Sequence, residues 1–258
     1  MNRTPDHLAG NVKAWQEQAQ WYVEPAEEAW ASAEPFWGIW AIPDRVVNLL
    51  PMNLDGRRCI EIGCGAGYVS AWLARRGATV IGIDPTPNQL RTANRLLAKD
   101  PLDITFELGF GEHIEYPDAS FDFAISEYGA ALWADPYEWI PEASRVLKPG
   151  GQLIFLTNSP FVAMCAPDNE ADGPVTDRLL RSYFDLYRTH WPDAPGQTEF
   201  HLTHSAWIDL FRSNSLTVER LVELQPEADA QTRYDWADIE WARNWPTEEA
   251  WVLRKEDR

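Results

Sequence analysis

Hydrophobic residues between positions 58 and 157 recur with two alternating spacings. Five short apolar runs have the length and composition of buried strands, and the stretches between them place apolar residues three and four positions apart, as amphipathic helices do. Strands that alternate with helices of this length indicate a parallel, doubly wound sheet. The predicted strands are 58–62, 79–83, 104–107, 121–126 and 152–157, the predicted helices are 66–76, 87–99 and 136–147, and a turn is expected at 148–151.

The pattern changes on either side of this region. The chain begins with an aromatic, helical stretch whose last predicted helix starts at Pro43. After the fifth strand come several turn signals, a helix that Thr203 can cap, and two closing strands. The expected bounds are 1–50 for an N-terminal helical cap belonging to the same domain as 51–258, 158–203 for a lid insertion, 175–190 for a helix inside it, and 216–224 and 251–254 for the closing strands.

The charge balance narrows the classes of partner. Asp and Glu number 40 against 22 Lys and Arg, a net charge of −18, so the surface repels nucleic acid and anionic lipid. No apolar run reaches the roughly 18 residues of a membrane span, and no signal peptide is evident. The three cysteines are too few for a disulfide scaffold and fit a reducing compartment. We therefore expect a cytoplasmic protein that binds neither nucleic acid nor membrane.

A glycine-rich turn follows the first predicted strand. Gly63, Gly65 and Gly67 allow unusual backbone dihedrals, and the turn points free N–H groups and a helix N-terminus at a ligand. That arrangement serves dinucleotides and S-adenosylmethionine alike. The dinucleotide fingerprint G-x-G-x-x-G requires a glycine at position 68, which is Tyr68 here.

Two carboxylates favour the second of these cofactors. Glu61 stands just before the glycines, where an acidic group suits a ligand with a cationic amino group rather than a pyrophosphate. Asp84 ends the second predicted strand and can accept hydrogen bonds from both ribose hydroxyls, which fits either cofactor. Spacing and charge together therefore favour S-adenosylmethionine.

Four segments carry a resemblance to a known family. They are EIGCGAG (61–67), GID (82–84), EHIEYPDASFDFAISE (112–127) and PEASRVLKPGGQLIF (141–155). Together they resemble the class I S-adenosylmethionine-dependent methyltransferases of the small-molecule type, and the run WADPYEWIPEASRVLKPGG with the Trp-rich start is similar to actinobacterial members. The resemblance implies a Rossmann-like, doubly wound, seven-stranded mostly parallel sheet with the last strand antiparallel. It also implies S-adenosylmethionine as cofactor, S-adenosylhomocysteine as product and a small organic acceptor.

The resemblance also implies residue roles. Gly63, Gly65 and Gly67 would border the methionine part of the cofactor, Glu61 would organise that loop and the amino group, and Asp84 would bind ribose. The other residues expected at the cofactor are Cys64, Pro85 beside the adenine, Gln89, Phe110, Gly111, Glu112, Glu127 and Tyr128.

The sequence departs from the family pattern after the third strand. The family often has an acidic residue there, in a pattern like GDAE, that contacts the adenine amino group. This chain has Phe110 at that place, so we expect its ring to pack on adenine or Glu112 to compensate. Glu127 follows the fourth strand, where the family often places a residue that faces the methionine end of the cofactor or the acceptor. Tyr128 is the next residue and is expected at the same opening of the site.

Methyl transfer is an in-line displacement that depends chiefly on positioning and on the exclusion of water. A general base is needed only for a nucleophile that arrives protonated. The candidate bases are Glu127, His201 and His204, with a structural or surface role as the alternative for both histidines. No third ligand at suitable spacing accompanies the histidines, so no metal is expected. Transfer to O or N is expected rather than to C.

Fourteen tryptophans are unusual for this length, and five fall in the first 40 residues. Large rings bury much area, so they can anchor the helical cap on the sheet. They can also form an aromatic wall against a flat or cationic acceptor. The candidates for such a wall are Tyr22, Trp37 and Trp40 in the cap and Tyr183 and Tyr187 in the insertion.

Two other functions stay open at this point. One is a cofactor-binding protein without transfer activity that serves regulation or assembly, which an intact glycine turn does not exclude. The other is a nicotinamide oxidoreductase, which the glycine spacing disfavours. The sequence leaves the acceptor unidentified and the oligomeric state open between monomer and homodimer.

Overall fold

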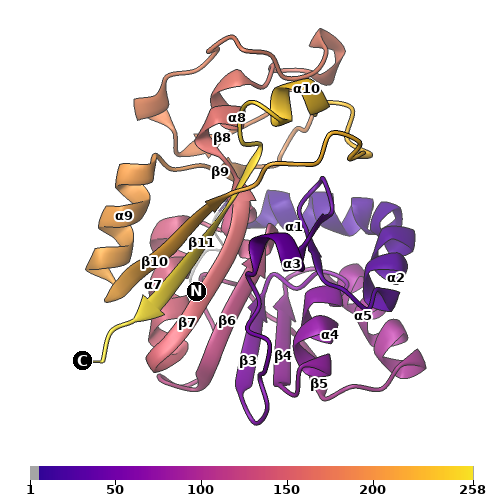
Figure 1. The fold of residues 1–258 in the computed structure, drawn as a ribbon, viewed down its shortest axis with the longest axis vertical. Coiled ribbons are helices and arrows are strands. Elements are labelled where there is room, and N and C mark those ends of the chain that lie inside the picture. The colour runs from indigo at the N-terminus through magenta and orange to yellow at the C-terminus, as the bar shows by residue number, and fades with distance from the viewer. Residues whose placement is uncertain (1–5, 258) are drawn as a thin grey trace.

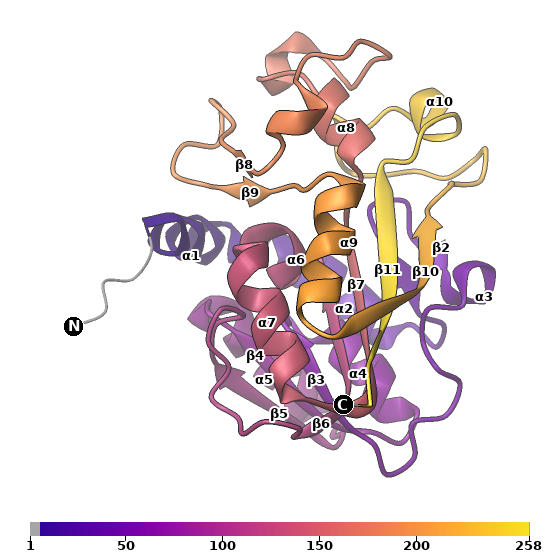
Figure 2. The same ribbon diagram turned by 90° about the vertical axis from the view of Figure 1, so that its left-hand side faces the viewer.

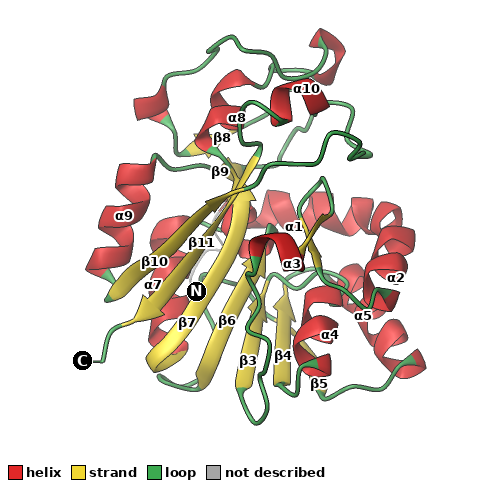
Figure 3. Ribbon diagram, viewed as in Figure 1, coloured by secondary structure: helices red, strands yellow, loops and turns green. Residues whose placement is uncertain are grey.

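A computed structural model describes residues 6–257 and contains a seven-stranded sheet with the order β10-β11-β7-β6-β3-β4-β5. Strands β3 to β7 run parallel, and β11 is antiparallel to both of its neighbours, as the arrows in Figure 3 show. The fold class predicted from the sequence is confirmed. The strands are β3 (Arg58–Ile62), β4 (Thr79–Asp84), β5 (Ile104–Leu108), β6 (Phe121–Glu127), β7 (Leu147–Asn158), β10 (Leu216–Glu223) and β11 (Glu248–Lys255).

Helices cover both faces of the sheet because successive strand residues point to opposite sides. On β6, Ile125 packs into a core with α2 and α4, whereas Ala124 packs into a second core with α7 and α9 (Figure 2). The bounds predicted for the helices at 66–76, 87–99 and 136–147 agree closely with the observed α4, α5 and α7. The helices are α2 (Val23–Ala31), α4 (Tyr68–Arg75), α5 (Pro87–Lys99), α6 (Gly129–Trp133), α7 (Pro136–Val146) and α9 (His204–Ser213), the last capped by Thr203 as expected.

The N-terminal cap, described from residue 6 to residue 50, crosses the edge of the sheet where the parallel strands end (Figure 1). Residues 1–5 of the predicted cap lie outside the described residues. Its elements are α1 (Asp6–Gln18), η1 (Ala19–Tyr22), α2, a hairpin of β1 (Phe36–Trp37) and β2 (Ile42–Pro43), and α3 (Asp44–Val47). The helix expected from Pro43 to residue 50 therefore stops early, because Asn48 adopts a left-handed conformation with φ of 51°.

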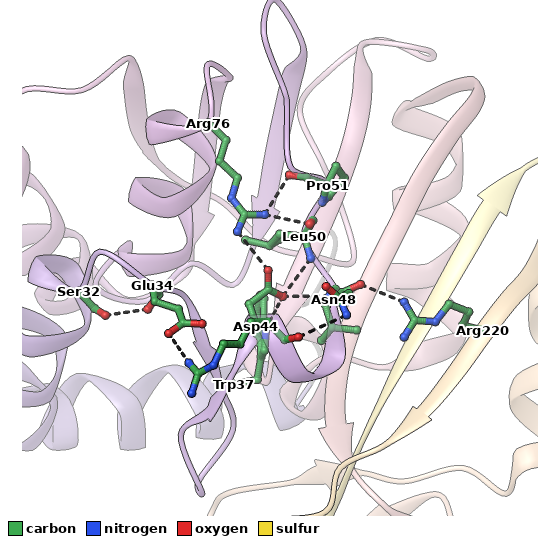
Figure 4. Close-up of polar contacts among 11 residues, drawn as sticks. Ser32, Glu34, Trp37, Asp44, Asn48, Leu50, Pro51, Arg76 and Arg220 are labelled. Atoms are coloured by element: carbon green, nitrogen blue, oxygen red, sulfur yellow. Dashed lines mark hydrogen bonds and ion pairs between the residues drawn. The ribbon is translucent and has the colours of Figure 1, made fainter.

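A buried carboxylate fastens the hairpin to the sheet domain. Asp44 Oδ1 accepts hydrogen bonds from Trp37 Nε1 at 2.9 Å and from the backbone N–H of Leu49 at 2.9 Å (Figure 4). Its Oδ2 pairs with Arg76 at 3.1 Å, and Arg76 also donates to the carbonyls of Leu50 and Pro51. Every polar atom of this buried group therefore has a partner, as burial of a charge requires.

Two sequence predictions after β6 differ from the structure. The turn expected at 148–151 lies inside β7, where Leu147 pairs with Phe121 ahead of a shift in register. The helix expected over 175–190 does not form, because tertiary hydrogen bonds take its backbone groups: the N–H groups of Leu180 and Arg181 donate to the carbonyl of Met164. The insertion instead contains α8 (Pro160–Cys165), η2 (Glu170–Asp172), η3 (Tyr183–Asp185), β8 (Arg188–Thr189) and β9 (Glu199–Phe200).

The insertion shares its side of the molecule with a second segment, residues 224–247, which joins β10 to β11 and contains α10 (Ile239–Ala242). Figure 1 shows both segments, in orange and yellow, above the ends of the parallel strands, where α1 also lies. Ligands of doubly wound sheets bind at this edge. Among residues 6–257, no helix is long and apolar enough to cross a membrane.

Candidate functional site

A cavity of about 580 Å³ opens at the carboxyl edge of the sheet. Its walls come mainly from the glycine turn after β3, the ends of β4 to β7, the N-terminal cap and the 224–247 segment, with further residues from α6 and β9. Every residue predicted at the cofactor lines this cavity except Gly67. The residues that the sequence placed in the glycine turn and at the strand ends therefore line a single cavity.

The three glycines of the turn have positive φ and serve different purposes. A side chain at Gly63 would meet the backbone of Gly129 and Ala130, and one at Gly67 would meet the ring of Phe106. Only at Gly65, with φ of +51°, would a side chain point into open space beside the cavity. Close packing of the chain explains the outer two glycines, and Gly65 is the position that leaves the backbone accessible to a ligand.

Two buried carboxylates shape the same turn. Asp84 Oδ2 accepts from the N–H of Gly65 at 2.8 Å, and its Oδ1 accepts from Thr86 at 2.8 Å. Glu61 Oε2 accepts from the N–H of Ser70 at 2.7 Å and from the Ser70 hydroxyl. Burial raises the pKa of both, and that of Glu61 reaches about 8. Neither has a cationic partner in the described structure, so each would gain from a positively charged ligand.

The loop after β5 lies across the cavity from the turn. Phe110 lines the cavity and forms an isolated bridge with His113, whose side chain is exposed. Glu112 also lines it, and its Oε1 lies 3.1 Å from His7 Nε2 and accepts from the N–H of Asp135 at 3.1 Å. The Glu112 carboxylate is thus held by the cap and by the start of α7.

Two pairs, each of one carboxyl and one phenol, stand side by side where β6 ends. The Tyr68 hydroxyl donates to Glu127 Oε2, and the Tyr128 hydroxyl donates to Glu248 Oε1. Burial raises the pKa of both carboxyls, to about 8 for Glu248. The hairpin of the cap closes over them, because Gly38 N donates to Glu127 at 3.3 Å and the next N–H donates to Glu248 at 2.8 Å.

The second pair carries signs of strain and of unmet hydrogen bonding. Tyr128 has φ of 55° and ψ of −69°, a conformation that non-glycine residues rarely adopt and that concentrates at functional sites. Glu248 Oε2 is buried without a partner, and so is Oδ1 of Asn158, its neighbour in register on β7. Asn158 and Tyr128 both line the cavity. Oδ1 of Asn158 is therefore an acceptor on the cavity wall that is available to a hydrogen-bond donor.

Neither histidine considered as a base lines the cavity. His201 is buried, with Nε2 3.0 Å from Glu199 Oε2, and it is Glu199 that reaches the cavity wall. His204 Nε2 lies 2.7 Å from Glu249, which raises the pKa of this histidine. Since Glu249 follows Glu248 in β11, it points to the opposite face of the sheet. Among residues 6–257, no group of His, Cys, Asp and Glu side chains is placed to hold a metal ion.

Of the aromatic residues predicted to contact the acceptor, Tyr22 lines the cavity and the other four do not. Trp37 and Trp40 are buried, with their Nε1 atoms bonded to Asp44 and Thr247, and they pack into the core beneath the cap. Tyr183 accepts from the N–H of His204, and Tyr187 donates to Asp135 at 2.6 Å, both outside the cavity lining.

Other residues reach the cavity without a signal in the sequence. Most of them come from the 224–247 segment, whose composition shows no periodicity, and from α1, α6 and the start of α4. Short turns and single helix positions of this kind are brought together only by tertiary packing. The additional polar and aromatic lining residues include Asn11, Trp15, Glu28, Phe36, Tyr68, Thr86, Trp133, Asn158, Gln231, Thr232, Arg233, Tyr234 and Trp236.

Comparisons with known proteins agree with this geometry. The family model described as "Methyltransferase domain" matches residues 60–155. A crystal structure of an S-adenosylmethionine dependent methyltransferase from Mesorhizobium loti has a TM-score of 0.67 at 24% identity, and covers 82% of this chain and 96% of that one. An uncharacterized methyltransferase from Mycobacterium tuberculosis is 34% identical over 185 residues, 68% of this chain and 71% of the relative. The chain belongs to the class I S-adenosylmethionine-dependent methyltransferases.

This methyltransferase is an enzyme whose methyl donor is S-adenosylmethionine. Family membership sets aside the nicotinamide oxidoreductase and the inactive binding protein that the sequence alone left open. The mycobacterial relative agrees with the similarity to actinobacterial members. A ubiquinone biosynthesis O-methyltransferase from Maricaulis maris is also 34% identical, over 104 residues that cover 40% of this chain and 41% of the relative.

Proposed function

We propose that this methyltransferase transfers a methyl group to an oxygen or nitrogen atom of a small organic acceptor. The observation that carries the proposal is the cavity itself. It runs from the glycine turn, where the cofactor is expected, to the carboxyl–phenol pairs and the aromatic cap, without a basic surface that would suit nucleic acid. The similarity of 104 residues of this chain to an O-methyltransferase also favours transfer to oxygen.

The lining residues fit the cofactor in charge and in shape. Asp84 holds Gly65 in place and keeps lone pairs for ribose hydroxyls, while Glu61 faces the cationic amino group. Phe110 offers a ring for the adenine in place of the more usual acid, and Pro85 and Gln89 line the same cavity. Bound S-adenosylmethionine supplies a methyl group on a positively charged sulfur, and buried carboxylates without cations suit that charge.

Three segments shield the reacting centre from water: the hairpin of the cap, the insertion and the 224–247 segment. The hairpin is fixed there by the bonds from its tip to Glu127 and Glu248. Exclusion of water and alignment of the acceptor supply much of the rate enhancement in a displacement of this kind. The cap therefore belongs to the methyltransferase domain in function as well as in packing.

Glu127 is the base candidate that the geometry supports. It lines the cavity, accepts a hydrogen bond from Tyr68, and has a raised pKa because it is buried. A carboxylate whose pKa approaches the working pH accepts a proton from a hydroxyl or ammonium nucleophile more effectively than an ordinary one. His201 and His204 do not line the cavity. We expect Glu127→Gln to lower kcat by about 100-fold while cofactor affinity changes little.

The first experiment is calorimetric titration with S-adenosylmethionine and, separately, with NADH. We expect binding of S-adenosylmethionine alone, lost in Asp84→Ala and kept in Asp103→Ala, which removes an exposed carboxylate beside the other end of β4. Labelled methyl donor then identifies the acceptor among small hydroxyl and amine compounds. Binding of NADH, or equal affinity in Asp84→Ala, would contradict the proposed site.

A further inference from the structure

The charge of the cavity lining is uneven. Six lining residues are acidic, and Arg233 is the one basic side chain among the described residues that line it. The acids suit the cationic groups of the cofactor. A lone guanidinium in such surroundings needs a different explanation. The acidic residues of the lining are Glu28, Glu61, Asp84, Glu112, Glu127 and Glu199.

Arg233 has aromatic neighbours instead of an acidic partner. Its guanidinium carbon lies 4.6 Å from the ring centroid of Tyr22 and 5.2 Å from that of Tyr234, and one N–H donates to the Tyr234 hydroxyl at 3.2 Å. Within residues 6–257, no carboxylate forms an ion pair with it, although acids outnumber bases almost two to one in the chain. Most of its five N–H donors are therefore available at the rim of the cavity.

The loop that carries Arg233 has a local hydrogen bond and is attached to the insertion at Trp236. Thr232 Oγ1 accepts from the N–H of Tyr234 at 3.3 Å, and the carbonyl of Trp236 accepts from the N–H of Val175 in the insertion at 2.9 Å. Trp236 also packs on a small apolar core that includes Val175 and Trp241. The guanidinium is thus presented by an anchored loop, and its stacking on two rings limits its freedom further.

We propose that Arg233, together with Tyr22 and Tyr234, forms a carboxylate-binding subsite at the rim of the cavity. A guanidinium binds a carboxylate through two parallel hydrogen bonds, and stacking on the flanking rings orients its plane. The subsite rests on the proposed function, since its ligand is a component of the methyl-transfer complex. Gln231 and Thr232 line the same rim and add polar groups for the ligand.

The carboxylate has two sources in such a complex. One is the methionine end of the cofactor, because Tyr68, which begins α4 directly after the glycine turn, lines the same cavity as Arg233. The other is an acidic acceptor that enters through the rim. Either carboxylate would bind the guanidinium through the same hydrogen bonds. If the carboxylate belongs to the cofactor, Arg233 controls cofactor affinity; if it belongs to the acceptor, Arg233 controls acceptor specificity.

Calorimetry with ligands that differ only in a carboxylate separates these sources. The full-length protein is titrated with S-adenosylmethionine and with decarboxylated S-adenosylmethionine, and its complex with S-adenosylhomocysteine is titrated with benzoate as an acidic acceptor probe. Variants Arg233→Gln and Arg233→Lys are compared with Arg243→Gln, an exposed arginine of the same segment outside the cavity lining.

A cofactor carboxylate predicts that the wild-type protein binds S-adenosylmethionine about 10- to 100-fold more tightly than the decarboxylated form, and that Arg233→Gln removes this difference. An acceptor carboxylate predicts unchanged cofactor affinity and a similar loss of benzoate affinity. In either case Arg233→Lys retains part of the effect and Arg243→Gln retains all of it. The subsite is refuted when the wild-type protein binds S-adenosylmethionine and Arg233→Gln alters neither preference. The proposed function fails instead when the wild-type protein does not bind S-adenosylmethionine.

Discussion

The Tyr128 hydroxyl donates a hydrogen bond to Glu248, a residue 120 positions later in the chain. The same carboxyl oxygen accepts from the N–H of Ile39 at 2.8 Å, so the end of β6, the start of β11 and the tip of the cap hairpin meet on one buried group. Burial raises the pKa of Glu248 to about 8. The carboxyl that joins these three segments is therefore largely protonated at neutral pH.

This linkage predicts how stability changes with pH. A carboxyl whose folded pKa is raised stabilises the fold fully below its unfolded pKa near 4.5, and that contribution is lost as pH rises towards 8. Glu248→Gln stays neutral and keeps an acceptor oxygen. We expect urea unfolding to show that its stability relative to wild type increases between pH 5 and 8, by at most about 1.4 kcal/mol per pH unit.

Glu219→Gln on the neighbouring strand β10 is the matched control. Its carboxylate is paired with Arg254 and has a lowered pKa, so its contribution is lost only when pH falls below the usual range of a glutamate. The control should therefore run parallel to wild type over the same pH interval. A constant difference between Glu248→Gln and wild type would contradict a raised pKa at Glu248.

Cofactor affinity should depend on pH through Glu61. Its pKa of about 8 in the ligand-free protein arises chiefly from burial, and a cationic amino group placed beside it would lower that pKa. Binding then releases a proton near neutral pH, so affinity should rise from pH 6 to pH 8. Calorimetry in buffers of different ionisation enthalpy measures the release. Glu61→Gln should bind about 10- to 100-fold more weakly and release fewer protons; the same proton release in the variant would argue against this role.

Two of the glycines should respond differently to the same substitution. Gly67→Ala places a methyl group against the Phe106 ring and should lower the free energy of unfolding by about 2–4 kcal/mol through overpacking and left-handed strain. Gly65→Ala meets no protein atom and adds only the strain, about 1–2 kcal/mol. Gly65→Ala should nevertheless lose more cofactor affinity. Thermal unfolding and calorimetry on both variants test this, and the reverse order would place the ligand away from Gly65.

Asp44 should be important for stability rather than for chemistry. Asp44→Ala leaves the Trp37 indole and two backbone N–H groups without their buried acceptor and Arg76 without its carboxylate. We expect a loss of about 3 kcal/mol, seen as a fall in Tm of about 6–12 °C. Arg45→Gln breaks the neighbouring exposed pair with Glu34 and should cost below about 1 kcal/mol. Equal losses would show that the buried network does not hold the hairpin.

The sequence determined the sheet and half of the site. Apolar periodicity located five parallel strands and their helices, because burial on both faces of a strand leaves a local record in the chain. The glycine turn, Glu61 and Asp84 were also readable, since each sits at a fixed place relative to a strand end, and parallel strands end at the same edge.

Tertiary structure alone decided the remainder. The 175–190 stretch has a helical pattern, yet hydrogen bonds from the N–H groups of Leu180 and Arg181 to Met164 hold it in another conformation. The Trp37 side chain is buried in the core and the Arg233 side chain lines the cavity, although the hydrophobic periodicity of the sequence indicates neither placement. Those outcomes depend on contacts between residues far apart in the chain, such as Tyr128 with Glu248. The local hydrophobic pattern indicates which residues of a strand or helix are buried, whereas the side chains that they contact are determined only when the whole chain packs.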